Sequence, residues 1–320
     1  MKKLCVIGEA LIDFIPNEKG LRLKDVMSFK RVAGGAPANV AAANAKLNGK
    51  SKIITKLGND SFGHHLLEVF KSVNIDTSDL VMSDCHSTAL AFVSLSSDGN
   101  RDFLFYRKNC ADLNLCEDEI KENALDDCGI LHFCSVDLVE SPMKKAHKKL
   151  IEMAMNKNIL ISFDPNVRIN LWDTHENCRN AICEFLPYAN IIKISDEELE
   201  FISGKTNIED AYEFFFKDRC QLLIYTMGKE GAMLITRDRQ VFISKGYQVD
   251  VFDTTGAGDA FIGAFLHQLL KNHDLNLDEL KKESIQEYLD FSNLYAAYTT
   301  TKEGAIGAMP TLDEIKGFKV

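Results

Sequence analysis

Short apolar runs alternate with longer amphipathic stretches along most of the chain, a rhythm that predicts strands alternating with helices. The predicted strands are Leu4–Gly8, Ser51–Leu57, Gly129–Cys134, Ile159–Asp164, Ile191–Ile194, Leu222–Met227 and Ala232–Thr236. The predicted helices are Ala38–Leu47, Gly63–Val73, Ser141–Asn156, Glu176–Leu186 and Asp196–Ile202. Apolar strands in such an alternation form a mainly parallel sheet with helices on both faces. We therefore expect an α/β fold and a single domain over residues 1–320.

One segment departs from this alternation. Thr88–Ser96 and Asn100–Arg107 are two extended runs joined around Asp98-Gly99, a dipeptide typical of hairpin turns. The apolar positions in these runs are Leu90, Phe92, Phe103 and Phe105. An exposed apolar patch of this kind is costly in a monomer. We therefore expect the hairpin to close as a lid over a ligand or to pair with a second copy in a homodimer; an edge of the main sheet is the alternative.

Composition and charge narrow the range of partners. Hydrophobic residues make up 46% of the chain and charged residues 26%, which excludes a disordered or collagen-like protein. The 37 Lys and Arg against 47 Asp and Glu give a net charge of −10. This balance argues against nucleic acid and anionic membranes as partners, because both bind basic surfaces. A local cationic pocket for a small anion is compatible with it.

The chain has no sequence signal for export or for a membrane. The first apolar stretch ends at Gly8-Glu9, too early for a signal peptide. No apolar run approaches the ~20 residues of a membrane helix. The nine cysteines are odd in number and lack the C-x-x-C spacing of a metal or redox site, which favours free thiols in a reducing compartment. We expect a cytoplasmic protein.

The strongest chemical signal is DTTGAGD at 253–259, directly before an apolar helix expected at Ala260–Leu270. Gly256, Ala257 and Gly258 leave the backbone N–H groups at the helix start uncovered, and the helix dipole there favours an anion. The first helical turn also favours the ionised form of Asp259. A carboxylate beside an anion hole suits a base that takes a proton from a hydroxyl during phosphoryl transfer. The alternative is a plain glycine-rich helix start.

A second glycine-rich segment, GGAPAN at 34–39, leads into the Ala-rich helix. Gly34 and Gly35 let the backbone approach a ligand closely, and Asn39 can donate and accept hydrogen bonds to hydroxyls.

Two other phosphate-binding motifs are incomplete in this sequence. The GK dipeptides at 49–50 and 204–205 lack the first glycine of a P-loop, and Phe261 occupies the third glycine position of a dinucleotide fingerprint. The two segments together favour phosphoryl transfer.

In this order and at this spacing, GGAPAN and DTTGAGD resemble the two signatures of the ribokinase-like (pfkB-type) carbohydrate kinases. The similarity covers essentially the whole chain and includes Gly8-Glu9 with Asp13, DPNVR at 164–168, TMGKEG at 226–231 and Gly304-Ala305. It implies a three-layer αβα ribokinase-like fold with a mainly parallel central sheet and a small β-sheet lid, formed by segments near 10–35 and 87–108. It also implies ATP-dependent phosphorylation of a sugar hydroxymethyl group.

The resemblance implies a role for individual residues. Asp259 is the implied catalytic base, and the implied anion-hole amides are those of Gly256, Ala257 and Gly258. The residues implied to bind sugar hydroxyls are Asp13, Gly34, Gly35 and Asn39. The residues implied to lie along the nucleotide are Thr226, Gly228, Gly231 and Asn293. The residues implied to help bind a monovalent cation such as K⁺ are Asp253 and Thr255.

One position departs from the family pattern. Many members have an N-x-x-E motif that organises Mg²⁺ through water, and this chain has Ser195 in the Asn position, with Glu198 keeping the carboxylate. The change is similar to the fructokinase branch. Residues 196–198 are also read more simply as an acidic first turn of a helix.

Further residues bear on the choice of substrate. Arg107, Asp112 and the stretch 164–172, which includes Arg168, are similar to fructokinases and, less closely, to 2-keto-3-deoxygluconate kinases. Arg107 or Arg168 could pair with a substrate carboxylate, whereas Asp112 suits a neutral polyol better. Fructose is therefore the expected substrate. The alternatives are 2-keto-3-deoxygluconate, ribose, aminoimidazole riboside or another furanose or nucleoside, and a sugar sensor without catalysis.

Overall fold

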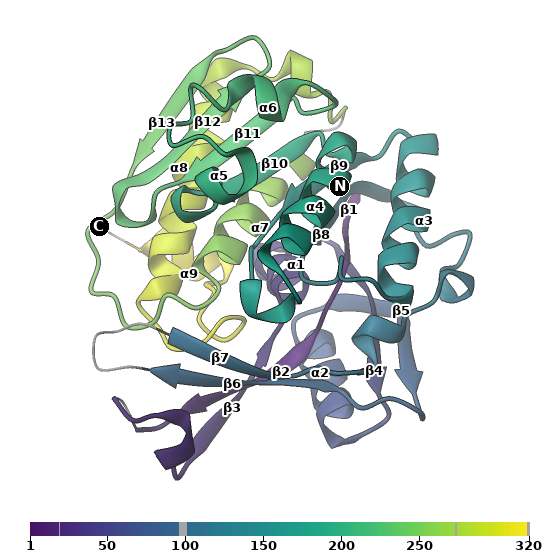
Figure 1. Cartoon of the computed structure of the whole chain (residues 1–320). Helices are drawn as coiled ribbons and strands as arrows, with labels where there is room; N and C mark the ends of the chain where they lie inside the picture. The colour runs from purple at the N-terminus through teal and green to yellow at the C-terminus, as the bar shows by residue number, and fades with distance from the viewer. Residues whose placement is uncertain (19, 96–100, 273, 319–320) are drawn as a thin grey trace.

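A nine-stranded sheet runs through the molecule in the computed structural model, which describes residues 1–18, 20–95, 101–272 and 274–318 (Figure 1). The strand order across the sheet is β13-β12-β11-β10-β9-β8-β1-β4-β5. In chain order these strands are β1 (Lys3–Ile7), β4 (Ser51–Gly58), β5 (Ile75–Ser83), β8 (Cys128–Cys134), β9 (Leu160–Asp164), β10 (Ile191–Ser195), β11 (Leu222–Thr226), β12 (Gly231–Thr236) and β13 (Val241–Lys245).

The large sheet is mainly parallel, as the alternating pattern predicts. Strands β5, β4, β1, β8, β9, β10 and β11 pair in parallel, and only β12 and β13 are antiparallel additions at one edge. All seven predicted strands are present. The apolar-run criterion missed the two edge strands, β5 and β13, because each has exposed or half-buried polar residues on one face.

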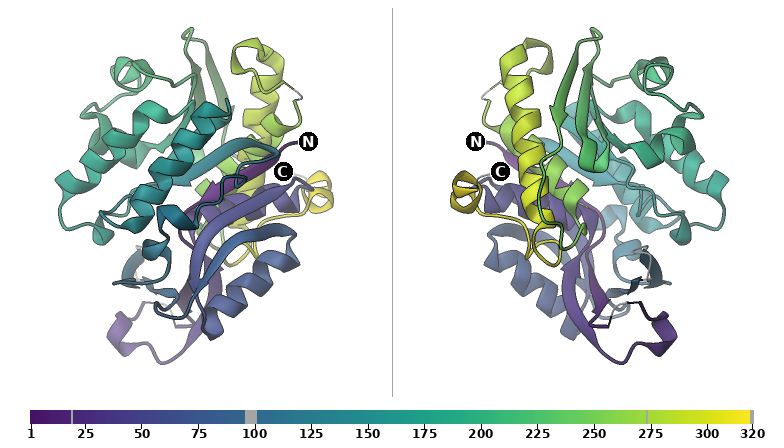
Figure 2. Two further views of the ribbon diagram at one scale, coloured as in Figure 1. Left: turned by 90° about the vertical axis from the view of Figure 1, so that its right-hand side faces the viewer. Right: turned by 90° about the vertical axis from the view of Figure 1, so that its left-hand side faces the viewer.

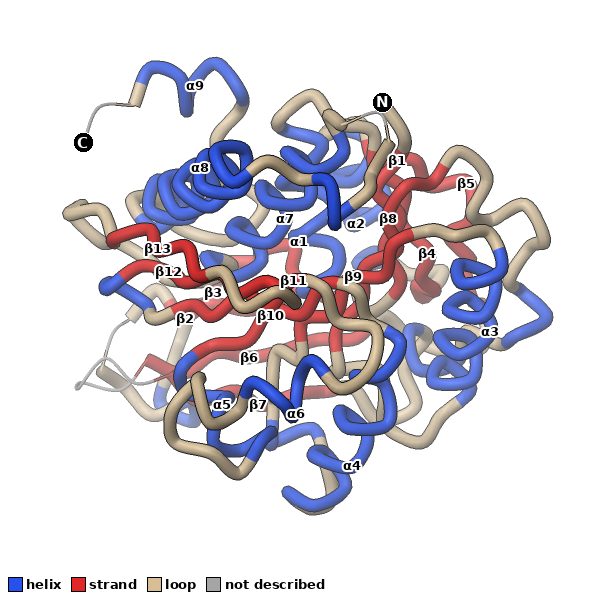
Figure 3. Tube along the Cα trace, turned by 90° about the horizontal axis from the view of Figure 1, so that it is seen from above, coloured by secondary structure: helices blue, strands red, loops and turns tan. Residues whose placement is uncertain are grey.

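Helices cover both faces of this sheet (Figure 3). They are α1 (Ala36–Lys46), α2 (Ser61–Ser72), α3 (Pro142–Asn156), α4 (His175–Phe185), α5 (Asp196–Ser203), α6 (Tyr212–Phe216), α7 (Ala257–Leu270), α8 (Lys282–Thr300) and α9 (Leu312–Gly317). Alternate residues of β1 enter separate cores, with Leu4 and Val6 on the α1, α7 and α8 side and Cys5 and Ile7 on the α3 and α4 side. The three-layer αβα prediction is confirmed, while α6, α8 and α9 were not anticipated.

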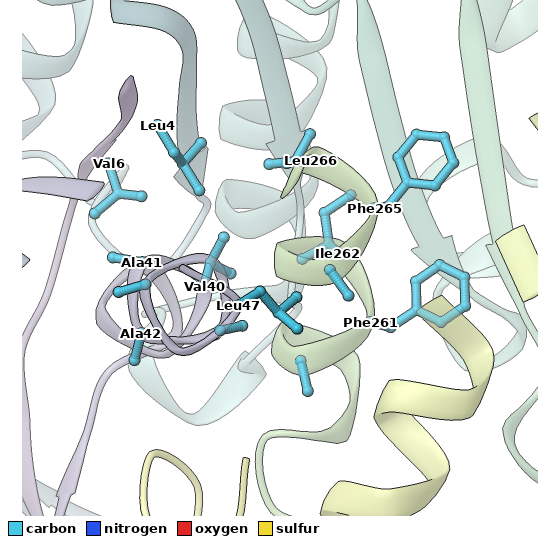
Figure 4. Packing of buried hydrophobic residues seen from close by; sticks show 14 of the residues in the cluster. Leu4, Val6, Val40, Ala41, Ala42, Leu47, Phe261, Ile262, Phe265 and Leu266 are labelled. Carbon is cyan, nitrogen blue, oxygen red and sulfur yellow. The ribbon is translucent and has the colours of Figure 1, made fainter. Parts of the chain in front are cut away.

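Helices α1 and α7 pack closely against each other beside β1 (Figure 4). Small residues permit this contact, since a side chain on Gly263 would place its Cβ only 2.5 Å from the Ala43 Cβ. The separation of two packed helices depends on the side chains at their contact. As a result the two helix starts lie together, and these are the ends that carry the two glycine-rich segments.

A smaller four-stranded sheet lies apart from the large one, at the lower end of the views in Figures 1 and 2. Its order is β3-β2-β6-β7, with bounds β2 (Leu11–Pro16), β3 (Phe29–Gly34), β6 (Ala89–Leu95) and β7 (Arg101–Tyr106). The predicted hairpin is therefore β6–β7, and it is not an edge of the main sheet. The predicted turn at Asp98-Gly99 and the side chain of Phe103 lie outside the described residues.

Two further expectations concern the molecule as a whole. All nine cysteines are free thiols, as their spacing predicts. Across the described ranges, no helix has both the length and the apolar character needed to cross a bilayer.

Candidate active site

The carboxyl ends of the parallel strands meet the starts of α1 and α7 at one edge of the sheet, where ligands bind in open α/β folds. A cavity of about 80 Å³ lies there. Its wall includes the predicted site residues Asp13, Gly35, Asn39, Arg168 and Asp259. Larger hollows of about 430, 630 and 480 Å³ lie elsewhere, and no residue of either signature lines them. The structure thus brings residues from the distant signatures to one site.

Asp259 lies in the first turn of α7 and is fixed by two amides. Asn39 Nδ2 donates to its Oδ2 at 2.8 Å, and Asn166 Nδ2 donates to its Oδ1 at 3.4 Å. Burial raises the pKa of Asp259, and the Asn39 hydrogen bond and the charges of Lys193 and Arg168 oppose this rise. Burial therefore acts against the start of the helix, which favours the ionised form of this carboxyl group. A carboxylate with a raised pKa is a better proton acceptor.

The start of α7 has the uncovered backbone that an anion hole requires. Gly256 precedes the helix with φ +73°, a left-handed conformation that favours glycine. Gly258 leaves open the space beside the helix, where a Cβ would lie 3.2 Å from Lys193 Nζ. The ammonium group of buried Lys193 thus lies next to Gly258 at the start of α7, where the Ala257 N–H donates to the Thr254 oxygen at 3.3 Å. Both features favour a bound anion.

Lys193 is itself bound to a buried carboxylate on the neighbouring strand. Its Nζ lies 3.0 and 3.2 Å from the two carboxylate oxygens of Asp164. Burial raises the pKa of Asp164 to about 7 despite this contact. Burial also favours neutral Lys193, but the carboxylates of Asp164, Glu198 and Asp259 outweigh that effect and raise its pKa, so the ammonium group stays charged.

Gly34 and Gly35 form a wall on which a side chain does not fit. A Cβ on Gly34 would lie 2.1 Å from Asp13 Oδ2, so these two predicted sugar-binding residues are direct neighbours. Gly35 has φ +108°, and a Cβ there would lie 2.4 Å from the backbone oxygen of Glu9. This segment therefore needs glycine at position 35, whereas a side chain at position 34 would have to displace the Asp13 carboxylate.

We predict that Gly35→Ala lowers the free energy of unfolding by about 1–3 kcal/mol, because it combines backbone strain with a clash against backbone. Urea denaturation measures the change. Gly317→Ala is the matched control, since nothing lies within 4 Å of a Cβ at Gly317. An unfolding curve for Gly35→Ala that coincides with that of the unchanged protein would contradict this reading of the loop.

Arg107 and Asp112 are brought together but are not on the cavity wall. Arg107 Nε donates to Asp112 Oδ2 at 2.6 Å, and its Nη1 donates to the Val136 oxygen at 3.0 Å. A further hydrogen bond joins its Nη2 to Asp137 Oδ1. The guanidinium group is thus occupied by protein partners. Arg168, in contrast, lines the cavity.

The residues predicted for the nucleotide lie near β11, β12 and β13. Thr226 ends β11 and donates from its hydroxyl to the Ile194 oxygen at 3.3 Å. Gly228 has φ +52° and open space around it, whereas a Cβ on Gly231 would lie 2.1 Å from the Ser244 oxygen. Asn293 Nδ2 donates to the Lys245 oxygen at 2.7 Å. Gly231 and Asn293 therefore fix the β12–β13 edge.

The predicted metal-site residues make defined local contacts. Both oxygens of Glu198 accept backbone N–H groups, from Val167 at 2.6 Å and from Ser195 at 2.8 Å. Asp253 Oδ1 accepts from the Thr255 N–H at 2.8 Å and from its hydroxyl at 2.7 Å. No three His, Cys, Asp or Glu side chains converge as metal ligands in the part of the chain that the structure describes. Glu198 thus fits a metal held through water better than direct coordination.

Sequence reasoning did not assign site roles to Glu9, Asn166 and Lys193. Glu9 and Asn166 line the cavity, and Lys193 lies beside Gly258 at the start of α7. A lysine within the apolar run IIKIS is a signal that could have been used, since a buried charge needs a partner. The partner itself, Asp164, becomes evident only from the pairing of β9 with β10.

The chain is similar in sequence to plant fructokinases. The probable fructokinase-2 of Arabidopsis thaliana is 39% identical over 312 residues, which cover 97% of this chain and 94% of that protein.

The chain is also similar to solved structures of fructokinases. A fructokinase from Xylella fastidiosa with bound ATP superposes with a TM-score of 0.90 at 32% identity and covers 98% of this chain and 97% of its own. A fructokinase variant from Vibrio cholerae O395 with fructose, ADP and potassium bound has a TM-score of 0.89 at 29% identity, covering 99% and 98%. The model of the pfkB family carbohydrate kinases matches residues 1–312. This chain belongs to the pfkB family of carbohydrate kinases.

Proposed function

We propose that this chain transfers the γ-phosphoryl group of ATP to a hydroxymethyl group of fructose. The observation that carries the proposal is the position of Asp259. Its carboxylate accepts a hydrogen bond from Asn39, a proposed sugar-binding residue, and it lies in the first turn of α7, whose start forms the proposed anion hole. A base in this position reaches a hydroxyl and a phosphate at once. The fructose-, ADP- and ATP-bound relatives support the choice of both substrates.

The residues divide the chemistry between them. Asp13, Gly34, Gly35 and Asn39 orient the sugar so that one hydroxyl lies next to Asp259. Asp259 takes the hydroxyl proton as the oxygen bonds to the γ-phosphorus and the bond to the β-phosphate oxygen breaks, which releases ADP. The amides of Gly256, Ala257 and Gly258 and the Lys193 ammonium group stabilise the charge on the transferring group.

Cations complete the proposed site. Mg²⁺ bound to ATP supplies further neutralisation of phosphate charge, and Glu198 would hold it through water. Asp253 and Thr255 would fix the loop before α7 with the help of a monovalent cation. The potassium in the Vibrio cholerae relative supports this assignment.

Coupled ADP release on a panel of sugars tests the function. We expect ATP-dependent turnover with fructose to exceed that with 2-keto-3-deoxygluconate, ribose and aminoimidazole riboside. The Arg107 guanidinium is already bound by Asp112 and Asp137, so it does not offer a free charge to a sugar acid. Higher turnover with 2-keto-3-deoxygluconate would mean that the substrate is the sugar acid and that Arg168 binds its carboxylate. Absence of ADP release with every sugar would favour a sugar sensor without catalysis.

We further propose that the small sheet is a lid over the sugar and that two lids pair in a homodimer. Phe14 and Phe92 stack with ring centroids 4.8 Å apart on one face of this sheet. Strand β7 adds Leu104 and Tyr106 to that face, and these side chains are 46% and 59% exposed. Apolar side chains of this size left in water favour association.

Light scattering is expected to give a mass near twice the 35.9 kDa of one chain. Leu104→Lys should shift the mass to that of a monomer, because it places a charge in the paired face. Ile243→Lys is the control, since Ile243 is exposed to a similar extent, 55% against 46% for Leu104, but lies on β13, away from the small sheet. A monomeric unchanged protein, or a Leu104→Lys protein that stays dimeric, contradicts pairing through the lid.

A further inference from the structure

A buried group of charges lies at the base of the small sheet. Arg107 follows β7 directly and binds Asp112 and Asp137, as described above. Glu9, which follows β1, is the third carboxylate near this guanidinium group. Arg107 and Glu9 are 5% and 3% exposed, and Asp112 and Asp137 are each 1% exposed. The group therefore joins the small sheet to the ends of β1 and β8.

The charges in this group do not balance. One guanidinium faces three carboxylates, and each carboxylate has one buried oxygen with no hydrogen-bond partner among the described residues: Glu9 Oε2, Asp112 Oδ1 and Asp137 Oδ2. Two excess negative charges in a buried site are strongly unfavourable. A proton on one carboxylate removes one of them. Glu9 is the member without an ion pair to Arg107, so it is the natural site for that proton.

The surroundings of Glu9 agree with this choice. Burial raises the pKa of Glu9 to about 7, Asp112 adds to the rise, and Arg107 and the Ala36 N–H oppose it. From β8, burial keeps the pKa of the Cys134 thiol well above its usual range. From α3, burial lowers the pKa of His147 to about 4, so the imidazole near Arg107 is neutral. Asp13, Arg168 and Asp259 face Glu9 from other parts of the cavity wall.

Glu9 also fixes the glycine loop on which the sugar is proposed to bind. Its Oε1 accepts from the Ala36 N–H at 2.8 Å, at the start of α1. Its backbone oxygen is the atom against which Gly35 packs, and Gly34 packs in turn against Asp13. A shift of Glu9 therefore acts directly on two consecutive residues of the loop, Gly35 and Ala36.

We propose that Glu9 is a positioning residue that holds the Gly34–Gly35 loop in its sugar-binding form as a neutral carboxylic acid. The inference rests on the proposed function and adds pH-dependent regulation of sugar binding at the same site. When Glu9 loses its proton, the buried group gains a second uncompensated charge. Arg107 is then drawn toward Glu9 and away from Asp112 and Asp137, which disturbs the loop and the base of the small sheet together.

The sign of the pH effect follows from the neutral form being the active one. A carboxyl with a raised pKa stays protonated up to that pKa and ionises above it. We therefore expect KM for fructose to be constant below about pH 6.5 and to rise about tenfold per pH unit above about pH 7.5. The KM for ATP should not follow this curve, because Glu9 does not line the anion hole.

Glu9→Gln tests the proposal, because an amide mimics the neutral acid and still accepts from the Ala36 N–H. We expect its KM for fructose at pH 6 to lie within about 3-fold of the unchanged protein and to stay flat up to pH 8.5. Glu9→Ala should raise KM about 5- to 150-fold at every pH, since it removes a buried hydrogen bond. Glu152→Gln, an exposed position on α3, is the matched control and should keep the pH dependence of the unchanged protein.

The results of these experiments distinguish a failure of the role proposed for Glu9 from a failure of the proposed function. A Glu9→Gln protein that loses affinity like Glu9→Ala, or that keeps the pH dependence of KM, overturns the role of neutral Glu9. If another sugar of the panel gives the higher turnover, the same comparison is made with that sugar. If no sugar is phosphorylated, the proposed function fails, and calorimetric titration of fructose across the same pH series still decides the role of Glu9.

Discussion

Replacing Asp259 by asparagine is expected to lower the turnover number for fructose-dependent ADP release by about 10²–10⁴-fold, the usual contribution of a positioned base. The amide can keep the hydrogen bond with Asn39, but it cannot take the proton of the attacking hydroxyl. Affinity for fructose should therefore change little. Initial rates at saturating ATP, together with calorimetric titration of the sugar, measure both quantities.

The control for this variant is Asp218→Asn, which makes the same chemical change at an exposed position far from the site. It should leave turnover and affinity unchanged. Turnover of Asp259→Asn within a few-fold of the unchanged protein would mean that another group accepts the proton. No other carboxylate on the cavity wall begins a glycine-rich helix, so that result would overturn the mechanism as a whole.

Lys193→Met is expected to reduce both stability and turnover. It leaves Asp164 as a buried carboxylate without its partner, which costs about 3–5 kcal/mol of unfolding free energy. It also removes the ammonium group beside the anion hole. Loss of one such charge-stabilising donor lowers turnover by about 10²–10³-fold. Denaturation curves and initial rates measure the two effects separately.

The double variant Lys193→Met with Asp164→Asn distinguishes a structural from a chemical role. With both charges removed, most of the lost stability should return, because neither member of this pair is left as an unpartnered buried charge. Turnover should stay low, since the transferring phosphoryl group still lacks its positive neighbour. Recovery of turnover along with stability would show that Lys193 only balances Asp164.

The predictable part of the fold lies where local pattern and burial agree. The central strands β1, β8, β9, β10 and β11 are largely buried on both faces, so a mainly apolar run identifies each of them. Edge strand β5 has the sequence IDTSDLVMS, in which four consecutive polar residues, from buried to exposed, interrupt the run. The hydrophobic pattern did not predict helix α8 for a related reason, because its buried positions are spread among polar ones.

Arg107 illustrates what a residue type can and cannot reveal. An arginine after a predicted lid strand suits a substrate anion, and the resemblance to fructokinases supports that assignment. In the folded chain two aspartates, one five and one thirty residues further along, occupy its guanidinium group. Which anion an arginine meets depends on the long-range pairing of strands and loops, and residue type alone does not contain that information.

The sequence by itself determined the layer order, the two glycine-rich helix starts and a candidate for the base, because glycine content, apolar period and helix position are local properties of the chain. Only the tertiary structure decided which partners these residues have. Asn39 binds Asp259, and Lys193 forms an ion pair with Asp164 beside Gly258. Glu9 belongs to the same buried group of charged residues as Arg107. Burial and the identity of charge partners set proton affinity, and both are fixed by contacts between residues that are far apart along the chain.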